Sequence, residues 1–274
     1  MLSNIREISI GIIIIITLNN CNGNGPKIPY PSPVVPDLNI NYFVPHYSPH
    51  DSSLFTEGLL FHDGQLYEST GSPDDLPRTR SLVGITDLNT GKFEKKIELD
   101  KVKYFGEGIV FLGNKLYQLT YKNQIGFIYD AKSFRKIGQF TYDNKEGWSL
   151  TTNGKDLIMS DGTSNITFLD STNLKPIKLL HVSENGIPLE NINELEYIKG
   201  FIYANIWMKD YVVKIDPNSG AVVGKLDLSA LTKDAKAKNP KCDVLNGIAY
   251  DSINDKIYVT GKLWTNIYEI SFPH

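Results

Sequence analysis

Five polar residues recur along the chain at positions where each could open a β-strand. Each stands beside glycine or glutamate, and apolar residues follow it. They are Glu57, Glu107, Glu146, Asn193 and Asn246. If such positions converge in the fold, carboxylates are brought together away from water, which shifts their pKa values. Carboxylates in that setting transfer protons or bind a metal ion. A polar residue at a strand start can equally serve only to bond a neighbouring strand.

Other kinds of catalytic site find little support in the sequence. The patterns G-x-S-x-G and H-E-x-x-H do not occur, nor does a phosphate-binding glycine loop. The five histidines have no spacing typical of a catalytic site. Cys242 has no histidine-bearing motif nearby, so we interpret it as an unreactive structural thiol.

The spacing of the five polar positions indicates a repeated structural unit. The steps from Glu57 to the last position measure 50, 39, 47 and 53 residues. Within four of the units a turn containing glycine, such as HDG or TNGK, separates two apolar stretches. Three units continue with a strand, an aspartate, a short turn and another strand, as in VVKIDPNSGAVVGKLDL. Four short strands repeated about every 40 to 50 residues are typical of β-propeller blades.

We therefore expect an all-β fold, a five-bladed β-propeller closed by N- and C-terminal strands, over residues 41–274. The last unit begins near Val244 and holds only about three strands before the chain ends. The apolar segment from Asn41 to Tyr47 is expected to supply the missing strand, which would also remove open sheet edges. Ala230 to Ala237 is the one segment that resembles a helix, and we place it in a loop.

The first forty residues predict export and attachment. Arg6 precedes an apolar run from Ile8 to Leu18, which is too short for an ordinary membrane span but fits the core of a signal peptide. Cys21 follows, as in a bacterial lipoprotein signal, although two asparagines stand where small residues are usual. We expect residues 1–20 to be a lipoprotein-type signal peptide and Cys21 to carry the lipid, with an ordinary secretory signal as the alternative.

Composition predicts the tether and limits the partners. Five prolines and two glycines occur in residues 22–39, so we expect residues 21–40 to form an extended tether. The chain would then be an exported bacterial lipoprotein of the cell envelope, at the periplasmic face or the cell surface. The net charge is only −3, and no basic stretch predicts a nucleic-acid partner. We expect a monomer that contacts the membrane only through its lipid.

A set of short strings, in order, resembles the glutaminyl-peptide cyclotransferases of the plant and bacterial β-propeller type. The strings are FTEG, LYESTG, FGEG, EGW with MSDG, NELEY, ANIW, LNGIAY and VTGKLW. They extend from about Phe55 to Trp264, and it is their order that makes the resemblance specific. The resemblance implies conversion of the N-terminal glutamine of peptides or proteins to pyroglutamate with release of ammonia. It implies no cofactor and no catalytic metal.

The resemblance also implies roles for particular residues, with Glu107 as the catalytic glutamate. The attacking amine must lose a proton and the departing nitrogen must gain one, and a single carboxylate between them can carry it. Because the attack is intramolecular, the protein mainly holds the reactive conformation and excludes water. The implied substrate-binding residues are Phe55, Glu57, Phe105, Tyr121, Trp148, Asn193, Trp207 and Lys262. For Trp148 and Trp207 the alternative is packing between blades.

Two of these residues depart from the family pattern. Glu57 stands where the family has glutamine, and the extra acid could shift the pKa of Glu107 or admit a different substrate. Tyr121 stands where tryptophan is usual, which would make one wall of the pocket smaller and more polar. Two other functions therefore stay open. One is a metal-dependent propeller hydrolase of the lactonase kind, and the other is a non-enzymatic propeller that binds peptides or proteins at a surface.

Overall fold

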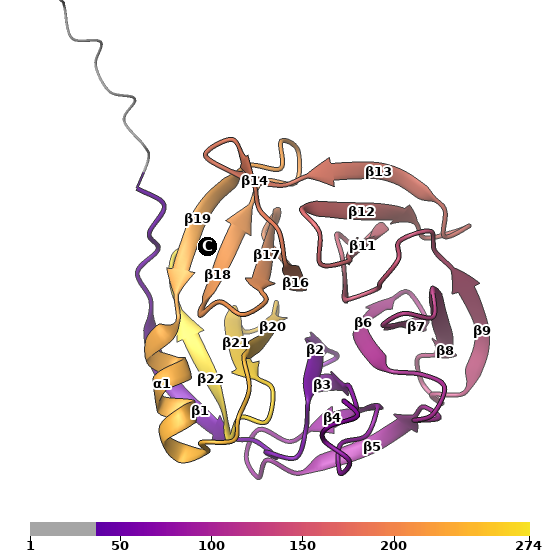
Figure 1. Cartoon of the computed structure of the whole chain (residues 1–274), viewed down its shortest axis with the longest axis horizontal. Coiled ribbons are helices and arrows are strands. Elements are labelled where there is room, and N and C mark those ends of the chain that lie inside the picture. The colour runs from indigo at the N-terminus through magenta and orange to yellow at the C-terminus, as the bar shows by residue number, and fades with distance from the viewer. Residues whose placement is uncertain (1–36) are drawn as a thin grey trace, which may run out of the picture. The chain divides into compact units, whose positions relative to one another are not determined.

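Five antiparallel sheets of four strands each are arranged in a ring around a central axis in the computed structural model, which describes residues 37–274 (Figure 1). The predicted signal peptide, Cys21 and the predicted tether up to residue 36 lie outside the described residues. Each sheet is one blade, and the innermost strands of neighbouring blades contact one another around the ring. The predicted five-bladed β-propeller is therefore confirmed.

Four blades run outward from the axis in chain order. Blade 1 consists of β2 (Thr56–His62), β3 (Gln65–Thr70), β4 (Leu82–Thr86) and β5 (Phe93–Glu98). Blade 2 consists of β6 (Gly106–Leu112), β7 (Lys115–Thr120), β8 (Ile125–Asp130) and β9 (Lys136–Thr141). Blade 3 consists of β10 (Ser149–Thr152), β11 (Asp156–Ser160), β12 (Asn165–Asp170) and β13 (Pro176–His181). Blade 4 consists of β16 (Ile192–Ile198), β17 (Phe201–Ile206), β18 (Tyr211–Ile215) and β19 (Val222–Asp227).

The fifth blade is built from both ends of the described chain. Its inner strands are β20 (Leu245–Asp251), β21 (Lys256–Gly261) and β22 (Asn266–Ser271), and its outer strand is β1 (Phe43–Pro49). Tyr47 of β1 lies opposite Tyr268 of β22 in an antiparallel pair. The predicted closure of the ring by an N-terminal strand is therefore confirmed.

The segment before β1 and the residue after it also form hydrogen bonds with the blades. Ile40 donates its N–H to the carbonyl of Lys225 on β19 at 2.8 Å, so residues 38–40 lie beside blade 4. His50 is buried, and its Nε2 lies 3.1 Å from both carboxylate oxygens of Glu68 on β3. Its Nδ1 lies 2.8 Å from the carbonyl oxygen of Trp264 in blade 5. His50 therefore joins the first and last blades where the ring closes.

Apolar layers between neighbouring blades form the core. Five clusters of buried apolar side chains occur, one for each pair of neighbouring blades. Between blades 1 and 2, for example, Val83 belongs to the same cluster as Phe111 and Phe127. Because each blade has apolar residues on both faces, no blade can bury them alone, and the closed ring is the arrangement that removes all of them from water.

Tight turns connect the end of each of two inner strands to the second strand of its blade. Asp63 and Gly64 join β2 to β3 with φ values of 48° and 74°, and Lys199 and Gly200 join β16 to β17 with 45° and 91°. Such left-handed pairs match the twist of the hairpins they connect. These turns follow the inner strands at one end of the ring. The inner strands therefore begin at the opposite end, where the loops that precede them also lie.

Three further elements lie outside the five blades. The strands β14 (Ser183–Glu184) and β15 (Ile187–Pro188) form a small hairpin between blades 3 and 4. The helix α1 (Ser229–Lys238) lies at the rim of the ring in Figure 1. Its Leu231 and Ala235 belong to the apolar layer of blades 4 and 5. The predicted short helix in a loop is thus confirmed. Within residues 37–274, no helix has the length and apolar character needed to cross a membrane.

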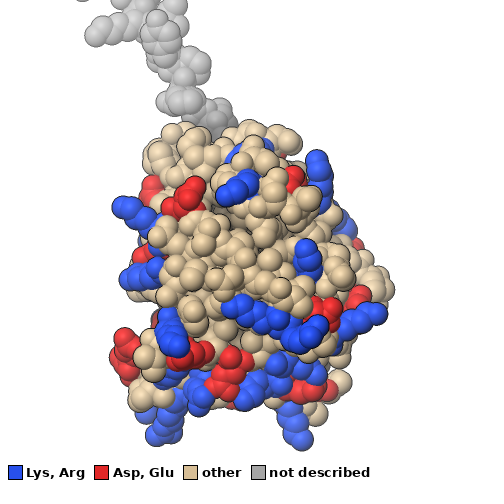
Figure 2. Space-filling view, turned by 90° about the vertical axis from the view of Figure 1, so that its right-hand side faces the viewer, with Lys and Arg blue, Asp and Glu red and all other residues tan. Residues whose placement is uncertain are grey.

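Charged side chains of both signs are interspersed on the face shown in Figure 2, mostly toward its lower part, and much of that face is uncharged. This agrees with the small net charge of the chain, −3. The face therefore presents no extended field of a single sign to a partner.

Candidate active site

All nine residues that the resemblance assigns to catalysis or substrate binding line one cavity of about 260 Å³ where the inner strands begin. The cavity is lined by Phe55, Glu57, Pro73, Phe105, Glu107, Tyr121, Trp148, Asn193, Trp207, Asp243 and Lys262. Every blade contributes at least one of these residues. The chain thus gathers into one volume residues that lie far apart in the sequence.

β-Bulges direct three of the polar residues into the cavity. The pairing of β2 with β3, of β6 with β7 and of β16 with β17 each contains one register shift, at Glu57, at Glu107 and at Asn193 respectively. One extra residue in a strand turns its side chain out of the regular alternation, a device common beside active sites. The repeated polar pair in the sequence is the signal of these bulges.

Glycines allow the inner strands to approach closely at this point. A Cβ atom on Gly108, the residue after Glu107, would lie 2.5 Å from the Cα of Ser149 on the next inner strand. A Cβ atom on Gly71 would lie 2.2 Å from the ring of Phe105 and 3.0 Å from Oε1 of Glu57. Any side chain at either position would displace the site, so glycine is required for packing.

Serine hydroxyls on the second strands fix the backbone at two of the site residues. The hydroxyl of Ser69 donates to the carbonyl oxygen of Glu107 at 2.7 Å. The hydroxyl of Ser160 donates to the carbonyl oxygen of Asn193 at 2.7 Å. Both serines are fully buried, so these bonds tie each blade to the next one with little exchange with water.

Two of the five repeated polar residues do not line the cavity, contrary to the expectation that all five crowd together. In blade 3 the position that faces the cavity belongs to Trp148, and Glu146 lies two residues earlier and accepts a hydrogen bond from its indole N–H at 2.9 Å. Asn246 is fully buried and donates its side-chain amide to the carbonyl of Thr56 at 3.0 Å. Glu146 was misplaced because β10 starts without the bulge, so the sequence repeat is shifted by two residues there.

A buried cluster of two glutamates and a lysine forms the polar side of the cavity. The ammonium of Lys262 lies 2.7 Å from each carboxylate oxygen of Glu57. Burial, and next the negative charge of Glu57, hold the pKa of Glu107 well above its ordinary value, against the opposing charge of Lys262. Burial also raises the pKa of Glu57, although Lys262 favours its ionised form. The cluster thus holds one carboxyl, Glu107, whose raised pKa suits it to proton exchange.

Aromatic rings form the remaining walls. Trp148 and Trp207 meet edge to face with ring centroids 5.9 Å apart. The ring centroids of Phe105 and Tyr121 are 5.7 Å apart. The Nζ of Lys262 lies 4.5 Å from the ring centroid of Phe55. Rings in these positions exclude water and can hold a flat amide group between them. Packing and pocket formation are not alternatives for the two tryptophans, since they contact each other and also line the cavity.

Asn193 carries a polar atom that the protein leaves free. The residue is only 3% exposed, and its Oδ1 has no hydrogen-bond partner among the described residues. A buried acceptor without a partner is costly unless a ligand supplies a donor. An amide or amine N–H group of a bound molecule would satisfy it.

Two residues of the cavity, Pro73 and Asp243, are absent from the set that the resemblance implied. Asp243 immediately precedes the start of blade 5, and its Oδ1 accepts the N–H of Val244 at 2.8 Å. Its negative charge contributes to raising the pKa of Glu57, after the larger effect of burial. An acidic residue just before a predicted inner strand was the available signal in the sequence.

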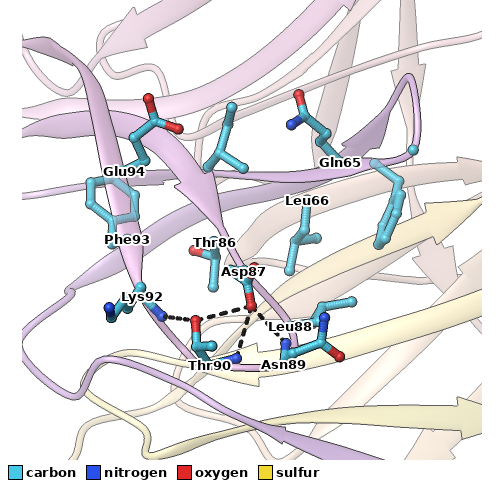
Figure 3. A pocket seen from close by; sticks show the side chains of 13 residues that line it. Gln65, Leu66, Thr86, Asp87, Leu88, Asn89, Thr90, Lys92, Phe93 and Glu94 are labelled. Atoms are coloured by element: carbon cyan, nitrogen blue, oxygen red, sulfur yellow. Dashed lines mark hydrogen bonds between the residues drawn. The ribbon is translucent and has the colours of Figure 1, made fainter.

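Two other kinds of site, a metal cluster and a larger hollow, offer no better place for the chemistry among the described residues. Among the described residues no group of three or more His, Cys, Asp or Glu side chains is placed to hold a metal ion. A hollow of about 670 Å³ lies at the other end of blade 1, beside the turns that follow β2 and β4 (Figure 3). Its Asp87 is engaged within its own turn, accepting the N–H groups of Asn89 and Thr90 at 2.9 and 2.8 Å. We therefore place the chemistry in the smaller cavity.

Comparisons with known proteins agree with this geometry. The family model described as glutamine cyclotransferase matches residues 27–272. A glutaminyl-peptide cyclotransferase from Arabidopsis thaliana is 40% identical over 224 residues, which cover 81% of this chain and 68% of that protein. The crystal structure of Myxococcus xanthus glutaminyl cyclase is similar with a TM-score of 0.77 at 33% identity, over 86% of this chain and 98% of that one.

Proposed function

This chain belongs to the glutamine cyclotransferase family and is a glutaminyl-peptide cyclotransferase, and from this premise we propose that Glu107 carries the proton that the reaction must move. The substrates are peptides or proteins that begin with glutamine. Family membership favours this function over a lactonase-like hydrolase and over a propeller that only binds.

The observation that supports the role of Glu107 is its burial beside Glu57 in the lining of the cavity. In the reaction the α-amine nitrogen attacks the side-chain carbonyl carbon of the same glutamine, so one C–N bond forms and the bond to the amide nitrogen breaks. Glu107 takes the proton from the attacking nitrogen and returns it to the departing one, which leaves as ammonia. A free α-amine has a pKa of about 7.7–8.0, and a carboxyl with a raised pKa is better matched to it than an ordinary one.

The other residues of the cavity would hold the glutamine in its reactive shape. Trp148 and Trp207 with Phe55 and Phe105 would enclose the side chain and exclude water, and Tyr121 would complete the wall. The free Oδ1 of Asn193 would accept an N–H of the substrate. Lys262, paired with Glu57, keeps positive charge close to the carboxyls. Holding the reacting atoms together is the main source of acceleration for an intramolecular attack.

Ammonia release from a short peptide that begins with glutamine tests the proposal. The chain from residue 22 is assayed as wild type, as Glu107→Gln and as Glu190→Gln. Glu190 is an exposed glutamate that does not line the cavity, so its variant serves as the matched control. We expect Glu107→Gln to lose at least about a hundredfold in rate, as expected when a general acid–base group is removed, and the control to keep wild-type activity.

Each assay is repeated with a chelator to separate the remaining alternatives. Release that survives the chelator and disappears in Glu107→Gln supports the proposal. Release that the chelator abolishes would instead indicate a metal-dependent enzyme. Full activity in a folded Glu107→Gln variant would remove Glu107 from the mechanism.

We also propose that the chain is an exported monomer, held at the cell envelope by a lipid on Cys21. The support is the apolar run before Cys21 and the proline-rich stretch after it. Labelling of the full chain with a radioactive fatty acid, lost in Cys21→Ser, is the expected result. An unlabelled wild-type chain would favour an ordinary secretory signal, and light scattering of the purified chain would show its oligomeric state.

A further inference from the structure

A second cavity of about 550 Å³ adjoins the catalytic cavity on the side of blades 1 and 2. The two cavities share three lining residues, Pro73, Phe105 and Tyr121. Phe105 and Tyr121 thus form a wall with the catalytic cavity on one side and the second cavity on the other. A molecule too large for the first cavity can extend past this wall into the second.

Three lysines give the second cavity a positive lining. They are Lys101, Lys103 and Lys122, and the acidic residue that lines it is Asp74. Lys103 and Lys122 are mostly exposed and face Asp100 and Glu146 across 3.5 and 3.8 Å. Ion pairs at such distances and exposures are weak and can be exchanged for a better partner.

Lys101 is held differently from the other two. Its ammonium donates to the carbonyl oxygens of Pro77 and Thr79 at 3.0 and 3.1 Å, and within residues 37–274 it forms no ion pair with a carboxylate. These bonds fix a positive charge between the loop of residues 72–80 and the loop before Phe105. A fixed cation loses little conformational freedom when an anion binds beside it.

The substrate needs room beyond the catalytic cavity. The catalytic cavity, at about 260 Å³, accommodates a single glutamine residue, whereas everything after that residue is attached to its backbone carbonyl and must leave through the mouth. An extended chain advances at most about 3.3–3.6 Å per residue, so the second and third residues of the peptide lie immediately outside the first cavity.

Given the cyclotransferase function proposed above, we propose that this second cavity is a subsite for the two residues that follow the N-terminal glutamine, and that it selects peptides with acidic side chains there. Carboxylates at these positions would meet the lysine-lined wall beyond Tyr121. Lysine side chains at the same positions would be disfavoured.

Three tripeptide amides test the selection, with two identical residues after the glutamine: Gln-Glu-Glu, Gln-Ser-Ser and Gln-Lys-Lys. We expect kcat/KM to be roughly three- to tenfold higher for the acidic peptide than for the serine peptide, the range that one or two exposed ion pairs produce. The preference should shrink as salt is added, because exposed charges are screened. The lysine peptide should be the poorest substrate.

Variants identify the source of the preference. The double variant Lys103→Gln with Lys122→Gln changes exposed side chains only, and it should reduce the ratio of acidic to serine peptide toward one. Lys101→Gln should reduce the same ratio, but it also removes hydrogen bonds to the loop carbonyls of Pro77 and Thr79. If Lys101→Gln does not fold, the double variant alone tests the proposal. Lys209→Gln is the control, since Lys209 lies two residues after Trp207 and lines neither cavity, and it should keep the wild-type ratio.

The outcomes separate this inference from the function on which it rests. Turnover of all three peptides at equal kcat/KM would overturn the subsite and leave the cyclotransferase function in place. A preference for acidic peptides that survives both lysine variants would also overturn it, since other residues would then be responsible. No ammonia from any peptide, and none from glutamine amide, would contradict the cyclotransferase function itself.

Discussion

Glu57 places a second carboxyl beside Glu107, at a position where the family pattern has glutamine. Its partner Lys262 neutralises much of its charge, but Glu57 still contributes to the raised pKa of Glu107. The consequence is that Glu107 gives up its proton at a higher pH than it would beside a neutral amide. This departure affects pH dependence more than it affects the shape of the cavity.

Replacing Glu57 by glutamine should therefore move the acid limb of the kcat/KM profile to lower pH. The change removes a negative charge next to Glu107 and leaves the positive charge of Lys262 uncompensated, and both effects lower the pKa of Glu107. A shift of about one pH unit or more is expected from a neighbouring charge in a buried site. The profile is measured with one peptide for both proteins, so the titration of the substrate amine cancels.

The other departure from the family pattern provides the control. Tyr121→Trp restores the usual ring without changing a charge, so it should alter KM and leave the acid limb where it is. An unchanged acid limb in Glu57→Gln would show that Glu57 does not act on Glu107.

The sequence predicted which residues line the cavity but not which of them contact one another. Nine cavity residues could be named because the ordered strings resemble a known family, and all nine line the cavity. The pair of Glu57 with Lys262 joins residues 205 positions apart, which no local pattern predicts. Asp243 carried a local signal, its place just before a predicted inner strand, but that it lines the same cavity as Glu57 depends on how blade 5 meets blade 1.

Among the elements, the turn between the third and fourth strands recurs in four blades with one construction. An aspartate accepts backbone N–H groups two or three residues later, and the residue four positions later has a positive φ. The aspartates are Asp87, Asp130, Asp170 and Asp216. Hydrogen bonds from the turn lower the pKa of each of these carboxyls. The turns therefore require the ionised aspartate.

Asp87→Ala should lower the unfolding temperature at neutral pH and lose this effect in acid. Because the pKa of Asp87 is depressed in the folded state, its stabilisation is present above the unfolded value of 3.8 and disappears as the pH falls through the folded value. Thermal unfolding followed by circular dichroism between neutral pH and about pH 3 measures both.

The matched control is Asp75→Ala, an exposed aspartate in a loop of the same blade. It should leave the unfolding temperature near that of the wild type at every pH. A difference between Asp87→Ala and wild type that stays constant down to the lowest pH would show that the ionised turn is not the cause.

Element positions were more predictable than their details. The repeat of glycine turns and apolar strands predicted the number of blades, and its incomplete last unit predicted the closing strand. The composition of residues 230–237 predicted the helix α1. The bulges were not predicted as such, because a bulge is a relation between two strands. Where blade 3 lacks one, the repeat placed Glu146 two residues away from the position that Trp148 occupies.

For the whole molecule, the contact of His50 with Glu68 secures the closure of the ring. Both side chains are fully buried, and Glu68 also accepts hydrogen bonds from Thr56 and Thr86 at 2.7 and 2.9 Å. Burial opposes a charge on His50, but the charge of Glu68 and the hydrogen bonds to Glu68 and to Trp264 outweigh it and raise the pKa of His50. His50, the residue after β1, thus contacts blade 1 through Glu68 and the loop of blade 5 through Trp264.

Glu68→Ala should destabilise the protein by about 3–5 kcal/mol, the typical cost of leaving one member of a buried pair alone. The stabilisation from His50 is complete below its unfolded pKa of 6.5 and is lost as the pH rises through its higher folded value. The cost of Glu68→Ala should therefore be larger at pH 6 than at pH 9, as measured by urea unfolding.

A surface glutamate of the same blade supplies the comparison. Glu98 on β5 pairs with Lys95 at the surface, and Glu98→Ala should cost no more than about 1 kcal/mol. Equal costs for the two variants would mean that the closure contact contributes no more than a surface ion pair.

The closing strand also sets when the protein can finish folding. His50 and its partner carbonyl at Trp264 are 214 positions apart, so the first strand of the propeller to leave the ribosome is among the last to find its neighbour. Bringing such distant segments together slows folding, and β22 keeps an open edge until it happens. A growing chain therefore remains an incomplete ring until its final strand is made, and only then can the fifth blade contribute its side of the cavity.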